Sequence, residues 1–177
     1  MKKLSSIPLA IGVVIVAGII LIFLAGPILA IEVTLGSAGL MYGIERFTPR
    51  RADRRVTVPT LVALAITGLL AVVLFHDTRA APSFGLVGNV VQFVVLAGVV
   101  VAGLVALLLH QARPVRTSLL LGGAAVEAAS VLALGVSEFG LISAVMLAVA
   151  GVAAYDDRPV KPTVVPDIAP PGFWRHL

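Results

Sequence analysis

Two apolar stretches of this chain are each too long to cross a lipid bilayer only once. Residues 7–44 and 117–155 span 38 and 39 residues and carry very few charges. A single helix of that length would extend about 57 Å, whereas the hydrocarbon core of a bilayer is about 30 Å thick. We therefore expect each stretch to break near its middle and to cross the membrane twice.

The composition supports a bilayer as the solvent of the fold. The chain is 59% hydrophobic and 12% charged, and a soluble domain carries about 25% charged residues. Residues 7–25 are also longer than the apolar region of a secretory signal peptide, so we interpret them as a retained first helix.

Glycine and proline indicate where the two long stretches break. Gly26-Pro27 combines a residue that permits a reversal with one that cannot continue a helix, and residues 135–140 contain two glycines, a serine and a glutamate. Pro59 is acceptable in the first turn of a helix. The sequence predicts six transmembrane helices, at residues 7–25, 28–46, 58–76, 86–110, 117–135 and 139–155.

The distribution of positive charge predicts the topology. With six helices and the N-terminus in the cytoplasm, twelve of the thirteen Lys and Arg residues fall on the cytoplasmic side, and Arg79 is the exception. This is the positive-inside pattern. In the alternative with four helices, in which both long stretches stay unbroken, the Arg cluster of residues 45–57 would lie on the other side of the membrane from Lys2 and Lys3. We expect an all-α integral membrane protein of three helical hairpins, both termini cytoplasmic, in the plasma membrane. The excess of Arg over Lys suggests a prokaryotic source.

Two regions are expected along the chain. Residues 1–157 form the six-helix transmembrane domain, and residues 158–177 form a cytoplasmic tail that holds five of the eleven prolines. The tail should run extended and polyproline-like. Its Phe173-Trp174-Arg175 segment is typical of an anchor at the membrane interface; a disordered terminus and a docking segment for a partner are the alternatives.

Glu127 is the foremost candidate for a functional residue. It lies ten residues into the fifth predicted helix, near the middle of the bilayer, where an acidic residue costs about 2.5–3.5 kcal/mol. Ser130 follows at i+3 on the same face, so we expect this face to point into the bundle. One interpretation is a proton or cation site, or a polar gate. The other, which we favour because no second ionisable residue lies at that depth, is a protonated Glu hydrogen-bonded to a neighbouring helix.

Three further polar residues lie near the outer surface in this topology. Asn89 and Gln92 are spaced i, i+3 on the fourth helix, and Glu32 lies near the start of the second. They could line a polar vestibule together. The alternative is that Asn89 and Gln92 each make one interhelical hydrogen bond, worth about 0.6 kcal/mol on average, and that Glu32 reaches the headgroup region.

Small residues and arginines have simpler interpretations. Small residues spaced three or four apart let helices approach closely, and they occur in two predicted packing stripes: Gly36, Gly39 and Gly43 on the second helix, and Gly98 and Ala102 on the fourth. A cluster of arginines after the second helix can contact lipid headgroups, although its topological role alone would account for it: Arg50, Arg51, Arg54 and Arg55.

Several classes of function are excluded or disfavoured. The chain has no Cys, which excludes disulfides, thiolate metal sites and iron–sulfur clusters. His76 and His110 should stand about 30 Å apart, at opposite membrane surfaces, so we expect no metal and no cofactor. The pI near 10.1 reflects loops beside the membrane rather than nucleic-acid binding.

We therefore expect a non-enzymatic membrane protein, a structural or accessory subunit of a larger membrane assembly. Its expected partners are the lipid bilayer and other membrane subunits or further copies of itself. The alternative is a small transporter or channel subunit in which Glu127 is coupled to a proton or cation. An intramembrane enzyme ranks third, because no pair of complementary catalytic groups lies at one depth.

Overall fold

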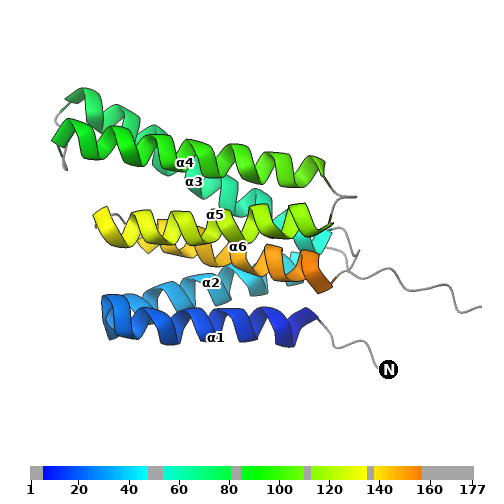
Figure 1. Cartoon of the computed structure of the whole chain (residues 1–177). Coiled ribbons are helices and arrows are strands. Elements are labelled where there is room, and N and C mark those ends of the chain that lie inside the picture. The colour runs from blue at the N-terminus through cyan, green and yellow to red at the C-terminus, as the bar shows by residue number, and fades with distance from the viewer. Residues whose placement is uncertain (1–5, 48–53, 81–84, 110–112, 135–137, 157–177) are drawn as a thin grey trace, which may run out of the picture.

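The computed structural model describes residues 6–47, 54–80, 85–109, 113–134 and 138–156. These residues form an all-helical bundle (Figure 1). Its six helices are α1 (Ser6–Ala25), α2 (Pro27–Phe47), α3 (Arg54–Ala80), α4 (Gly85–Leu108), α5 (Arg113–Leu134) and α6 (Glu138–Asp156).

The six predicted helices are confirmed within the described ranges. Five of them are long and apolar enough to cross a membrane, and the described apolar part of α1 is the shorter Ala10–Ala25. The largest difference concerns α3, which begins at Arg54, so that Pro59 lies inside the helix rather than in its first turn as predicted. Arg is a good helix former, so the helix begins with Arg54 and Arg55, before the apolar segment.

The turn between α1 and α2 explains the break in the first apolar stretch. Gly26 has a φ of 92°, a conformation that L side chains rarely adopt. Its carbonyl accepts a hydrogen bond from the Ala30 N–H at 3.2 Å. Pro27 is the first residue of α2, where a helix needs no N–H donor.

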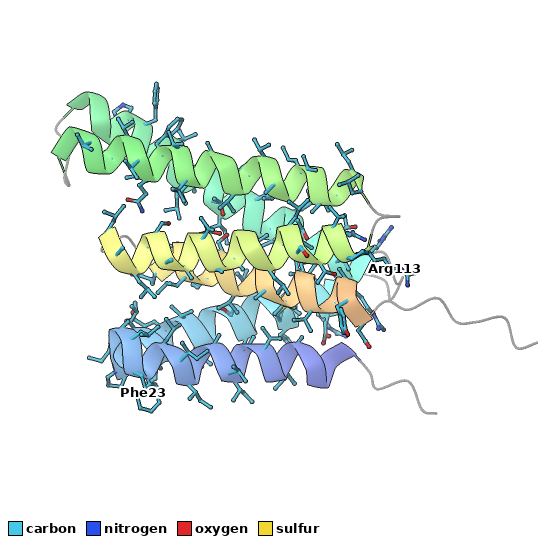
Figure 2. The ribbon with its side chains drawn as sticks, in the orientation of Figure 1. Phe23 and Arg113 are labelled. Carbon is cyan, nitrogen blue, oxygen red and sulfur yellow. The ribbon has the colours of Figure 1, made fainter. Side chains whose placement is uncertain are left out.

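Consecutive helices run in opposite directions along the bundle (Figure 1). We call the end where α3 finishes and α4 starts the α3–α4 end, and the opposite one the α4–α5 end. The first turn of α1 and the last turn of α6 both lie at the α4–α5 end (Figure 1). Helix termini carrying arginine lie there too, and Arg113 marks this end in Figure 2.

Helix α6 occupies the centre of the bundle. It packs against α5, α3, α1 and α2, and its residues from Gly140 to Leu147 are all buried. Small residues permit this crowding. A Cβ added at Gly140 would lie 2.6 Å from Val131 Cγ2, and one added at Gly151 would lie 2.8 Å from Leu121 Cδ2.

Helix α1 lies at the periphery and turns large apolar side chains away from the bundle. Phe23 is 84% exposed and points outward from α1 in Figure 2, as Ile15 and Ile19 also remain about half exposed. Such a surface is unfavourable in water and natural in contact with lipid tails. Helices α1, α5 and α6 also border an apolar groove of about 300 Å³ with Leu21, Ala125 and Ala148 in its walls and floor.

Candidate functional site: a polar cluster at the centre of three helices

Three helices bring polar side chains together around Glu127. Glu127 comes from α5, Thr67 from α3 and Ser143 from α6, and all three are 0% exposed. Thr67 Oγ1 lies 2.7 Å from Glu127 Oε1, and Ser143 Oγ lies 3.3 Å from Glu127 Oε2. The two hydroxyl oxygens lie 2.6 Å apart. The cluster therefore joins α3, α5 and α6 at one height.

A backbone carbonyl completes the cluster. The Ala63 oxygen lies 3.0 Å from Thr67 Oγ1 and 3.0 Å from Ser143 Oγ. The contact with Thr67 spans i to i−4, as is common for threonine in apolar helices. Both hydroxyls thus have an acceptor on α3 besides the carboxyl group.

The cluster is enclosed, and among the described side chains of the packed helices none supplies a countercharge at its height. The described charged side chains of the packed helices lie near helix ends, including Arg54 of α3, Arg116 of α5 and Glu138 of α6. Within the described ranges, no three His, Asp or Glu residues lie close enough to hold a metal ion. The arrangement is suited to hydrogen bonding and to proton exchange.

Ser130 contributes to the helix rather than to the carboxyl group. Its hydroxyl donates to the backbone oxygen of Glu127 at 2.9 Å. It is half-buried on the face that the sequence predicted.

Asn89 and Gln92 lie inside the bundle, on the buried face of α4. Both are 0% exposed, and neither Nε2 nor Oε1 of Gln92 has a hydrogen-bond partner among the described residues. Glu32 is exposed on α2, which lies across the bundle from α4 (Figure 1). The structure therefore brings Asn89 and Gln92 together and leaves Glu32 apart from them.

The predicted small-residue stripes occupy different environments. Gly36 lies against α6, where an added Cβ would lie 2.7 Å from Ile142 Cδ1. A Cβ added at Gly39 or Gly43 would meet no described atom within 4 Å. On α4, Gly98 is exposed and Ala102 is half-buried. The buried face of that helix instead follows a heptad spacing, with Asn89, Gln92, Leu96, Val99, Gly103 and Ala106.

Of the four arginines predicted at the headgroups, Arg54 and Arg55 are exposed at the start of α3, and residues 50 and 51 lie outside the described ranges, as does the tail. Sequence reasoning placed Arg116 in a loop, but α5 begins at Arg113 and Arg116 is only 6% exposed. It also missed Thr67 and Ser143. The available signal was the heptad spacing of Thr60 and Thr67, both of which are buried on α3.

Comparisons with protein-family models, with curated protein sequences and with solved structures gave no match to this chain.

Proposed function

We propose that the protein is a non-enzymatic integral membrane protein that serves as a structural or accessory subunit of a membrane assembly. The observation that carries this proposal is the enclosure of Glu127. Its carboxyl oxygens contact Thr67 and Ser143 inside the chain, which holds three helices in register, and the Glu127 side chain is fully buried. Apolar surfaces such as that of α1 remain for lipid or for a partner.

The proposal includes a topology of three helical hairpins with both termini in the cytoplasm of a prokaryotic cell and the helices in its plasma membrane. The clustering of Arg46, Arg54, Arg55 and Arg113 at the α4–α5 end supports it (Figure 1), because basic residues are retained on the cytoplasmic side. The α3–α4 end would then face outward.

Association is tested by photo-crosslinking in native membranes followed by native electrophoresis. Photoreactive side chains at Phe23 of α1 and at Val94 of α4 sample two different exposed surfaces. We expect a discrete higher-mass species from at least one position. Migration as a monomer with lipid adducts alone, from both positions, would contradict the role as a subunit.

The topology is tested by cysteine labelling, for which the chain offers a natural background because it contains no Cys. Ser83→Cys should react with a membrane-impermeant maleimide added to intact cells, and Ala52→Cys should react only after the cells are opened. Labelling of Ala52→Cys from outside would invert the proposed orientation.

A small transporter or channel subunit is the second candidate. Gln92 favours it, because a fully buried amide with no partner among the described residues is typical of a position that meets water or a solute. Reconstituted vesicles would show a proton or cation flux that Glu127→Gln reduces. A flux unchanged by that substitution would remove Glu127 from the transport step.

A further inference from the structure

The number of protons that the cluster can share among its hydrogen bonds indicates whether the Glu127 carboxyl group is ionised or neutral. Five oxygen–oxygen contacts of 2.6–3.3 Å join Glu127, Thr67, Ser143 and the Ala63 carbonyl. The two hydroxyls supply two protons, and a carboxylate and a carbonyl can only accept. If Glu127 were ionised, Thr67 would donate to Oε1, and the single proton of Ser143 would go either to Thr67 or to Oε2. The first choice leaves Oε2 of a charged group without a donor from the cluster, and the second leaves the 2.6 Å contact between the two hydroxyl oxygens without a proton.

A neutral carboxylic acid fits the same contacts better. Its O–H would donate to Thr67 over 2.7 Å, Thr67 to Ser143 over 2.6 Å, and Ser143 to the Ala63 carbonyl over 3.0 Å. Every link then carries one proton, and the chain ends on an acceptor. Hydrogen bonds aligned in this way polarise and strengthen one another.

Among the residues that the structure describes, no positive group lies beside Glu127 to balance a negative charge. Helix α4 contains no titratable residue between Gly85 and Leu108. Apart from Glu127, the titratable residues of α3, α5 and α6 lie near the helix ends: Arg54, Arg55, His76, Asp77, Arg79, Arg113, Arg116, Glu138, Tyr155 and Asp156. A buried carboxylate without a partner charge is strongly disfavoured.

The register of α4 and α5 places Gln92 just beyond the cluster. Val99 faces Gly123, where an added Cβ would lie 3.7 Å from Val99 Cγ1. The helices are antiparallel (Figure 1), so seven residues toward the α3–α4 end lead to Gln92 on one helix and Ser130 on the other. Ser130 is three residues from Glu127, which is roughly 4.5 Å along the axis. Asn89 lies one turn further toward the same end.

We propose that Glu127 is a proton-binding site in its neutral form, and that Gln92 and Asn89 hold water through which Glu127 exchanges its proton with the α3–α4 end of the bundle. The Gln92 amide offers a donor and an acceptor, which a water needs when it bridges buried groups. In each exchange the carboxyl group gives one proton to water and takes one back, so charge is conserved. The proposal deepens the second candidate function by naming its ligand and its side of access, and it does not require net transport.

The test is infrared spectroscopy of the purified full-length chain in lipid bilayers. A protonated carboxylic acid has a C=O stretching band apart from the amide bands, and this band shifts when the proton is replaced by deuterium. We expect such a band to be present in the native protein, absent in Glu127→Gln, and shifted after transfer to deuterated water.

Gln92→Met keeps the length of the side chain and removes its polar atoms. We expect it to slow the band shift roughly tenfold or more, because water then loses its hydrogen bonds next to the cluster. Asn89→Leu should slow the shift as well and serves if Gln92→Met does not fold. Thr60→Val is the matched control, because Thr60 is also buried and polar but lies toward the α4–α5 end of α3, away from Gln92. In this variant Glu127 should exchange its proton at the native rate.

Each outcome separates one part of the proposal from the function. A missing acid band in the native protein would overturn the neutral form of Glu127. A band whose exchange is unchanged in both Gln92→Met and Asn89→Leu would overturn the route. Neither result depends on a flux or on a crosslinked partner, so failure of this site and failure of the proposed functions are distinguishable.

Discussion

At the scale of single residues, the Glu127 cluster specifies which helices meet and at which height. Hydrogen bonds between helices inside membranes contribute only about 0.6 kcal/mol on average and about 1.7 at most, so the cluster adds modest stability. Its larger effect is to disfavour other relative positions of the helices. Any slip of α5 along α3 separates Glu127 from Thr67 and leaves a polar group against lipid or apolar side chains.

A double-mutant cycle measures this coupling. Thr67→Val and Glu127→Met should each destabilise the fold, and together they should cost less than the sum by roughly 0.5–1.7 kcal/mol, because either substitution alone breaks their shared hydrogen bond. The measurement is the free energy of unfolding in lipid or mild detergent. Ser130→Ala with Thr67→Val is the control pair and should be additive, because the Ser130 hydroxyl bonds within its own helix. If the Thr67 and Glu127 effects are additive, the two side chains do not stabilise each other, which would contradict the coupling of α3 to α5 through this hydrogen bond.

At the scale of elements, the size of the side chains decides which helix is central. Helices α1 and α6 are both apolar, but α1 contains six Ile and three Ala, whereas α6 contains one Ile and five Ala. Without a hydrophobic force between helices in lipid, close approach of backbones drives association. The helix with small residues therefore lies among four neighbours, and the helix with large residues lies at the edge.

Substitutions at two glycines test this account. Gly151→Val should destabilise the bundle by about 1–3 kcal/mol, because an added Cβ would already lie 2.9 Å from Leu121 Cγ and 3.3 Å from Leu120 Cβ. Gly98→Val is the matched control at an exposed position with nothing within 4 Å, and it should change stability little. Thermal unfolding of the two variants makes the comparison, and equal losses would mean that α6 is not tightly enclosed.

The helices were predictable and the contacts between them were not. Length, Gly26-Pro27 and the polar breaks locate all six helices, because bilayer thickness fixes how long each can be. The burial of Glu127 also followed from its cost in lipid. Its partners did not, since Thr67 and Ser143 are weakly polar residues that occur on any membrane helix, and a sequence does not give the relative height of two helices. The buried face of α4 likewise depends on where α3 and α5 lie.

At the scale of the whole molecule, the bundle consists of a four-helix unit and an added pair. Helices α3 to α6 contain the Glu127 cluster and Gln92, while α1 and α2 pack against each other, against α6 and slightly against α3. Where the described residues show this packing, it is apolar, as for Gly36 of α2 against Ile142 of α6, and lipid tails are as apolar as such a surface.

A chain lacking residues 1–47 should therefore still insert and fold. In it, Thr67→Val should lower the melting temperature by the same amount as in the complete chain, because the hydrogen bonds to Glu127 and Ser143 lie within the remaining unit. The control is the truncated chain without the substitution. Aggregation of that chain, or loss of the Thr67 effect, would show that α1 and α2 are needed to form the cluster.

The central position of α6 has a consequence for biosynthesis. Chains are synthesised from the N-terminus and begin to fold as they emerge, and α6 is the last of the six described helices to leave the ribosome. Until α6 is inserted, α3 and α5 lack the helix that packs against both of them, and the Glu127 carboxyl group lacks its contact with Ser143. Ribosome stalling or early termination before Glu138 should leave an intermediate with an unsatisfied acid in lipid, of the kind that membrane quality-control proteases degrade.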